Sequence, residues 1–168
     1  MKEIRNLFFV FLILTIGICC GEDLDVSINV EIDQTLASYW IKTLQEAYNQ
    51  FLSFFIDLAN NTTALELKTV RDFKNAATVC FNAVKGKKHN KIGDLEKTVN
   101  EVTYALTKAI KSGKRAIQDL NSTPEKKLHK KLSSVMAKLK AALYLTITLI
   151  TPIKNQSKTN ITDSETPE

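Results

Sequence analysis

Histidine, cysteine and glycine are scarce in this chain of 168 residues, which has 2 His, 3 Cys and 5 Gly. His89 and His129 have no Cys, Asp or second His at the spacing of a metal site, and no glycine-rich loop is present to cradle a phosphate. The alternating acids near the N-terminus lack the glycine and the bidentate glutamate of a calcium loop. The sequence therefore predicts no catalytic site, no metal site and no cofactor.

Arginine is rare among the basic residues, and no aromatic residues are interleaved with the lysines. Lys and Arg together number 23, and all but Arg5, Arg71 and Arg115 are lysines, which disfavours bidentate recognition of phosphates. Proteins that stack nucleic-acid bases place aromatic side chains beside their cations. The sequence therefore predicts no nucleic-acid partner.

The first 21 residues have the pattern of a secretory signal peptide. Lys2 and Arg5 form a basic region, and residues 7–18 form an apolar run that is shorter than the roughly 20 residues of a membrane span. We therefore expect a secreted, extracellular protein with no transmembrane segment. The alternative is a lipoprotein leader that ends at Cys19, although the bulky Ile18 disfavours such a site.

Removal of the signal peptide leaves Cys80 as the single thiol. It falls at the edge of the apolar face of its predicted helix, and we expect a buried and unreactive side chain. The alternative is an intermolecular disulfide through Cys80.

Five N-x-[ST] sequons follow the signal peptide, where the residue frequencies predict about two by chance. All five fall between the predicted helices or in the C-terminal tail, so we expect at least one of them to carry a glycan. The acceptor residues are Asn60, Asn61, Asn121, Asn155 and Asn160.

Apolar and polar residues alternate strictly from residue 23 to residue 33, which is the period of a strand with one buried face. No other segment of the chain offers an obvious strand partner. We therefore predict that residues 22–33 form an extended arm that lies on the helices and not in a sheet. Asp33 or Thr35 is expected to cap the helix that follows.

The most apolar helix is predicted between Asp33 and Asn60. Apolar residues recur there every three or four positions, and they include Trp40, Phe51 and Phe54. So wide an apolar face needs other helices to cover it. We interpret these aromatic residues as core and not as a cofactor site.

Two further amphipathic helices are expected over residues 64–85 and over residues 94–120. A capping box from Thr63 to Glu66 predicts the start of the first of these helices, and Gly86 its end. Gly113 falls on the apolar face of the other, which indicates a close helix crossing.

The last helix is predicted over residues 124–151, and Pro152 is expected to end it. Together these features predict an all-α fold: an antiparallel, up-down-up-down four-helix bundle over 34–152, with the extended N-terminal arm and a disordered polar tail over 153–168. The predicted core positions of the last helix are Leu128, Leu132, Val135, Met136, Leu139, Leu143, Ile147 and Ile150.

Basic residues are concentrated in the middle of the chain, where residues 67–140 hold eighteen bases against six acids, a net +12. In an up-down bundle the end of the third helix meets the start of the fourth, so a basic patch is expected at one pole. Such a patch suits anionic glycans or lipid headgroups, although a solvated surface is the simpler interpretation. Its predicted members are Lys108, Lys111, Lys114, Arg115, Lys126, Lys127, Lys130 and Lys131.

Residues 141–153 contain no charge, and Ala141, Tyr144 and Leu145 fall outside the predicted core face. Exposed apolar surface of this kind needs a cover. We expect residues 24–32 of the arm to pack over it, with the acids of the arm facing Lys85 to Lys91. The alternative is that a partner protein, a second subunit or a lipid covers it.

These observations favour a secreted, non-enzymatic helical binding or effector protein that acts on another extracellular protein or a receptor. Two alternatives stay open. One is a carrier that holds a hydrophobic ligand, such as a lipid, inside the bundle. The other is a surface lipoprotein or adhesin that binds anionic glycans through its basic pole.

Overall fold

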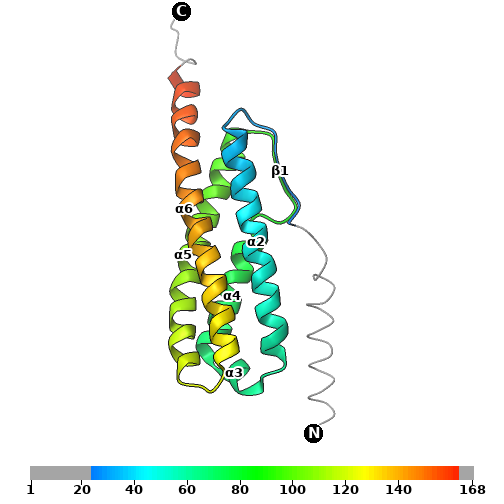
Figure 1. Cartoon of the computed structure of the whole chain (residues 1–168). Coiled ribbons are helices and arrows are strands. Elements are labelled where there is room, and N and C mark those ends of the chain that lie inside the picture. Colours follow the sequence, from blue (N-terminus) through cyan, green and yellow to red (C-terminus); the bar gives the residue numbers. More distant parts are fainter. Residues whose placement is uncertain (1–23, 163–168) are drawn as a thin grey trace, which may run out of the picture.

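The computed structural model describes residues 24–162, with side chains through Asn155 (Figure 1). The predicted signal peptide, residues 1–21, and the end of the tail, residues 163–168, lie outside this part of the chain. Five helices pack against one another, which confirms the all-α class.

The helices are joined by short connections, and the four long ones lie side by side in Figure 1. The elements in chain order are β1 (Val26–Ile28), α2 (Gln34–Ala59), α3 (Thr62–Glu66), α4 (Lys68–Asn82), β2 (Lys87–His89), α5 (Ile92–Asn121) and α6 (Lys126–Thr162).

Helix α2 matches the predicted first helix and supplies the centre of the core. Asp33 caps it, because one carboxylate oxygen accepts hydrogen bonds from the backbone N–H groups of Thr35 and Leu36, both at 3.0 Å. Such a cap contributes about 1 kcal/mol. Trp40 and Phe54 are completely buried, as expected for core residues.

The second predicted helix is divided in two at Leu67, so the single helix over 64–85 is wrong. Asn61 caps the short α3 by accepting from the Ala64 N–H at 2.9 Å, in place of the predicted Thr63. Leu67 has φ −63° and ψ 121°, an extended conformation that ends α3 and starts α4. Gly86 follows the end of α4 with φ +70°, a left-handed conformation that suits glycine.

The N-terminal arm pairs with the segment after α4, so that β1 and β2 form a two-stranded parallel ribbon. Ile28 is opposite His89, the Gly86 N–H donates to the Asp25 carbonyl, and the Asn29 N–H donates to the His89 carbonyl, both at 2.8 Å. The prediction that the arm has no strand partner is therefore wrong. A parallel pair needs a long crossover, which α2 to α4 provide, and β2 joins through its backbone without any apolar alternation.

The ribbon lies beside α2, on the side away from α6 in Figure 1. Leu24 and Val30 are buried, and the Leu24 N–H donates to Oε1 of Gln45 at 2.5 Å. The prediction that the arm covers residues 141–153 is wrong, because Tyr144 is 72% exposed. Backbone pairing with β2 holds the arm on the other side of α2.

Helix α5 begins at Ile92, two residues before the predicted start, and Lys91 precedes it without a side-chain cap. Gly113 confirms the predicted close crossing. A Cβ atom at this position would overlap the sulfur of Met136 and lie 3.1 Å from a ring carbon of Phe73. Only glycine leaves room for these two side chains in their observed positions.

Helix α6 continues through Pro152 to Thr162. The predicted helix end at Pro152 is wrong, and the part of the predicted disordered tail over 153–162 is helical. A proline inside a helix removes one hydrogen bond and costs about 3 kcal/mol. The next residue, Ile153, is completely buried, and its burial offsets part of that cost.

The inner face of α6 includes a polar residue, Thr146, which is completely buried. Its hydroxyl donates to the Ala142 carbonyl at 2.6 Å and accepts from the indole N–H of Trp40 at 2.8 Å. Ile147, predicted as core, is instead 52% exposed, so that prediction is wrong. The buried row consists of Ala142, Thr146 and Leu149. Because Thr146 is polar, this row does not stand out as an apolar period in the sequence.

Candidate functional site

The predicted glycan acceptors lie at helix ends and within α6. Asn60 follows the last residue of α2, Asn61 caps α3, and Asn121 is the last residue of α5. Asn155 and Asn160 are inside α6, contrary to the expectation that all five would lie outside helices. The side chain of Asn160 is outside the described part of the chain, and glycosylation at each position stays a prediction.

Cys80 is completely buried on the inner face of α4. Burial raises the pKa of its thiol to about 12. A disulfide to another chain through this residue would require α4 to unfold locally.

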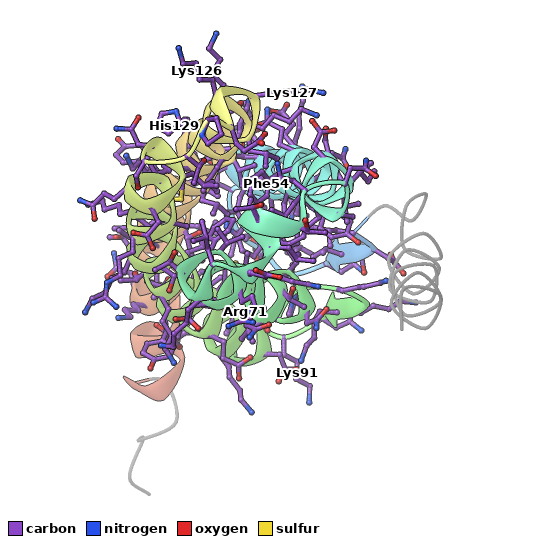
Figure 2. The ribbon with its side chains drawn as sticks, turned by 90° about the horizontal axis from the view of Figure 1, so that it is seen from below. Phe54, Arg71, Lys91, Lys126, Lys127 and His129 are labelled. Atoms are coloured by element: carbon purple, nitrogen blue, oxygen red, sulfur yellow. The ribbon has the colours of Figure 1, made fainter. Side chains whose placement is uncertain are left out.

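The eight predicted patch residues do not all gather at one pole. Lys108 lies thirteen residues before the end of α5, about 20 Å along the helix axis, and its ammonium lies 5.4 Å from the ring centre of Tyr104. Lys126 and Lys127 project from the end where α6 begins (Figure 2). The exposed members of the predicted patch are Lys108, Lys111, Lys114, Arg115, Lys126, Lys127 and Lys130.

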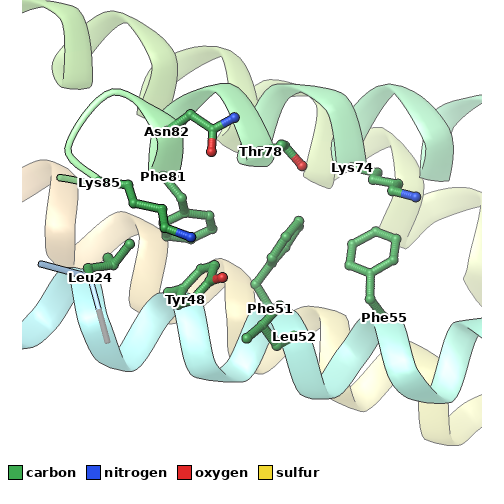
Figure 3. A pocket seen from close by; sticks show the side chains of 10 residues that line it. All are labelled: Leu24, Tyr48, Phe51, Leu52, Phe55, Lys74, Thr78, Phe81, Asn82 and Lys85. Atoms are coloured by element: carbon green, nitrogen blue, oxygen red, sulfur yellow. The ribbon is translucent and has the colours of Figure 1, made fainter. Parts of the chain in front are cut away.

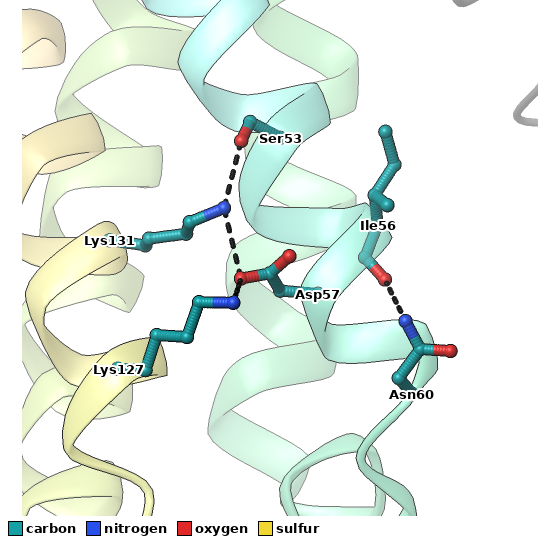
Figure 4. A network of polar contacts seen from close by, with 6 residues as sticks. All are labelled: Ser53, Ile56, Asp57, Asn60, Lys127 and Lys131. Atoms are coloured by element: carbon teal, nitrogen blue, oxygen red, sulfur yellow. Dashed lines mark hydrogen bonds and ion pairs between the residues drawn. The ribbon is translucent and has the colours of Figure 1, made fainter.

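Two lysines of this predicted patch form ion pairs with α2 (Figure 4). The ammonium groups of Lys127 and Lys131 lie 3.1 and 2.9 Å from the same carboxylate oxygen of Asp57. Hydrogen bonds from Lys131 and then Lys127 lower the pKa of Asp57. Part of the predicted patch is therefore used to join α2 to α6.

Helix α6 exposes apolar side chains near its middle, and α2 exposes one near its start. Tyr39, Tyr144 and Ile147 are 59%, 72% and 52% exposed. By length and composition alone, Lys126–Asn155 would suffice to cross a membrane, a test that core helices of soluble proteins also meet. The inner face of the same segment is packed in the core, with Leu149 and Ile153 completely buried.

A groove of about 220 Å³ lies between α2 and α4 (Figure 3). The rings of Tyr48, Phe51 and Phe55 from α2 and Phe81 from α4 line its apolar part. Its remaining lining residues are Leu24, Leu52, Lys74, Thr78, Asn82 and Lys85.

Ring-to-ring contacts set the spacing between α2 and α4. Phe81 lies with its ring centre 5.1 Å from that of Tyr48 and 5.2 Å from that of Phe51, and Phe51 lies 6.0 Å from Phe73. The backbones of α2 and α4 approach each other less closely than those of α2 and α6 or of α4 and α5. Large side chains therefore hold these two helices apart, and the groove is the space beside them.

Lys74 brings a cation to one end of this apolar groove (Figure 3). Its side chain is partly buried, and its ammonium lies 5.3 Å from the ring centre of Phe55. Desolvation by burial lowers the pKa of Lys74. Among the described residues no carboxylate pairs with it, and none lines the groove.

The described part of the chain has no group of three or more His, Cys, Asp or Glu side chains that could hold a metal ion. His89 is buried beneath the ribbon, and neither of its ring nitrogens has a hydrogen-bond partner there. Burial, and then the charge of Lys87, lower the pKa of His89, against a smaller opposing effect of Asp94. A buried neutral imidazole in this position acts as an apolar packing group.

Comparison with protein-family models, with curated proteins and with solved structures finds no match for this chain. The geometry and chemistry of the site itself are therefore the only indication of function.

The groove was not predicted from the sequence, although its lining residues on α4 follow a helical spacing. Lys74, Thr78 and Phe81 recur at i, i+4 and i+7, which places a cation in line with an aromatic residue along one side of α4, and Lys85 follows just beyond its end. The aromatic residues of α2 were correctly interpreted as buried. Sequence alone does not indicate that the edges of these buried rings also line an opening.

Proposed function

We propose that this protein is a non-enzymatic binding protein that holds a hydrophobic small molecule in the groove between α2 and α4. The observation that carries the proposal is the groove itself, about 220 Å³ in volume and lined by four aromatic rings with a few polar groups. Ligand sites are concave and mostly apolar, with a small number of polar groups that orient the ligand. A dry cavity of about 150 Å³ takes up benzene, so this volume suffices for a short apolar chain.

The site belongs to a secreted protein in this proposal, with the helices in the antiparallel, up-down-up-down order of a four-helix bundle. The apolar run over residues 7–18 supports secretion. The pairing of Asp57 with Lys131 and of Glu46 with Lys138 supports opposite directions for α2 and α6.

Binding of 1-decanol, measured by isothermal titration calorimetry, tests the proposal. Thr78→Trp places an indole in the groove and is expected to weaken binding at least tenfold. Thr107→Trp is the matched control, because Thr107 is an exposed threonine on α5 that does not line the groove. An unmodified protein that binds no decanol, or two variants with equal affinity, would overturn the proposal.

An extracellular protein partner is the second candidate function, and the exposed apolar side chains of α6 favour it. Tyr144 and Ile147 lie one turn apart on the outer face of this helix. A Tyr144→Ser/Ile147→Ser variant is expected to keep the melting temperature and to lose partners that crosslink to the native protein in extracellular fluid. Unchanged crosslinking would reject this surface.

A further inference from the structure

We infer that the ligand of the groove is an anionic amphiphile, with its carboxylate at the Lys74 ammonium and its apolar chain over Phe55 and Phe51 toward Phe81. This inference depends on the proposed function and adds the chemical class of the ligand. Three features of the groove support it: the charge of its lining, the surroundings of Lys74 and the order of residues along it.

The lining of the groove is cationic. Among the described residues that line it, Lys74 and Lys85 are basic and none is acidic. The acids of α2 lie on a different side of the helix, where Glu46 and Asp57 pair with lysines of α6. The charge of Lys74 therefore attracts an anionic headgroup at its end of the groove and repels a cationic one.

Lys74 bears an electrostatic cost that an anion would relieve. Its ammonium is partly removed from water, and the desolvation that lowers its pKa is not offset by any carboxylate of the described residues. The face of the Phe55 ring, 5.3 Å away, is a weaker partner than a carboxylate. A bound carboxylate would complete an ion pair at the edge of an apolar surface, where water screens it less.

The order of residues along the groove gives the ligand a direction. Lys74 lies beside Phe55 at one end, Phe51 is in the middle, and Phe81 and Leu24 are at the other end (Figure 3). Lys85 is also at that other end, where it already takes part in another interaction. Lys74 and Phe81 are seven residues apart on α4, about 10 Å along its axis. A medium-length alkyl chain spans this distance, and Leu24 of the arm lines the far end.

Three amphiphiles with the same alkyl chain test the inference: decanoate, 1-decanol and decyltrimethylammonium. In calorimetric titrations at pH 7 and low salt, the native protein is expected to bind decanoate about tenfold more tightly than decanol, the value of one charge-assisted hydrogen bond. Decyltrimethylammonium is expected to bind more weakly than decanol. The preference for decanoate should shrink as salt is added.

Variants of one side chain assign the preference to Lys74. Lys74→Met keeps the apolar stem and is expected to bind decanoate and decanol equally, and Lys74→Glu to favour decyltrimethylammonium. Lys97→Met removes an exposed lysine of α5 and is expected to keep the native preference. Circular dichroism melting of each variant checks that it is folded.

The outcomes separate this inference from the proposed function. If decanol binds but decanoate is no tighter, the anionic headgroup is wrong and the hydrophobic site stands. If Lys74→Met keeps the preference for decanoate, the placement of the carboxylate at Lys74 is wrong. If none of the three amphiphiles binds to the native protein, the proposed function fails and this inference fails with it.

Discussion

The two sides of α2 are built from different chemistry, although they belong to the same helix. Toward α6, polar side chains pair in sequence along the helices: Glu46 with Lys138, Gln50 with Ser134, and Asp57 with Lys131. Toward α4, the contacts are between aromatic rings. The polar pairs are directional, so they fix the register of α2 against α6 and let the two backbones lie close together. The rings between α2 and α4 meet edge to face, and their size holds the two backbones apart.

Burial of a residue and closure of the seam between two helices, the line along which they pack, are therefore separate properties. Phe51 and Phe55 are only 5% and 4% exposed, yet both line the groove. The seam toward α6 contains the hydrogen bond between Trp40 and Thr146, and both of these side chains are completely buried. The same helix therefore packs closely against α6 on one side and borders an open groove on the other.

The largest expected effect comes from two adjacent phenylalanines of α2. Phe54 is completely buried against Phe73 and lies outside the groove lining, so Phe54→Ala is expected to lower the free energy of unfolding by about 3–5 kcal/mol. Phe55→Ala should cost about half as much, because the space it leaves joins the groove and does not form a closed cavity. Urea unfolding of both variants measures the difference. Equal losses would mean that the seam toward α4 is as closed as the core.

Helical periodicity made most of the fold predictable from the sequence. The apolar rows around Trp40 placed α2, and Gly113 on an apolar face indicated the close crossing with α6 that the structure has. Both predictions depend on local patterns, which the sequence contains in full.

The errors have a common physical cause, which is that tertiary contacts override local signals. β2 is a strand because the backbone of the arm pairs with it, and its own residues Lys87 to His89 carry no strand pattern. Pro152 does not end α6, since the buried Ile153 holds the following turn in place. The groove was missed for a related reason: the distance between α2 and α4 follows from the sizes of facing rings, and no local pattern encodes it.

The second expected effect concerns the buried hydrogen bond of the seam toward α6. Thr146→Val keeps the shape of the side chain but leaves the indole N–H of Trp40 buried without its acceptor, at a cost of about 1–3 kcal/mol. Thr148→Val is the matched control, because Thr148 is exposed two residues along the same helix, and its loss is expected to stay within about 0.5 kcal/mol. Thermal unfolding followed by Trp40 fluorescence compares the two. Similar melting temperatures would show that this contact does not hold the seam.

A pH-dependent effect is expected at the ribbon that flanks the groove. Because the pKa of His89 is lowered in the folded protein, the unfolded chain binds more protons between that value and the usual pKa of about 6.5. Stability contributed by the neutral imidazole is therefore present above pH 6.5 and is lost as the pH falls toward the folded value. His89→Phe should remove this part of the pH dependence in melting curves from pH 7.5 to pH 5. A variant with the native pH profile would place its origin elsewhere.

The smallest expected effect tests whether the polar pairs on the α6 side contribute measurable stability. Asp57→Asn is expected to lower the free energy of unfolding by about 0.5–1 kcal/mol at low salt, because two ammonium groups share this partly exposed carboxylate. The lowered pKa of Asp57 means that the contribution is present at neutral pH and is lost as the pH falls below the usual aspartate pKa of about 3.9. Asp72→Asn breaks the exposed pair with Lys68, at 3.5 Å on the surface of α4, and should change stability by less. If the two variants are indistinguishable in chemical denaturation, the difference between the seams lies in helix spacing alone, and charge plays no part in it.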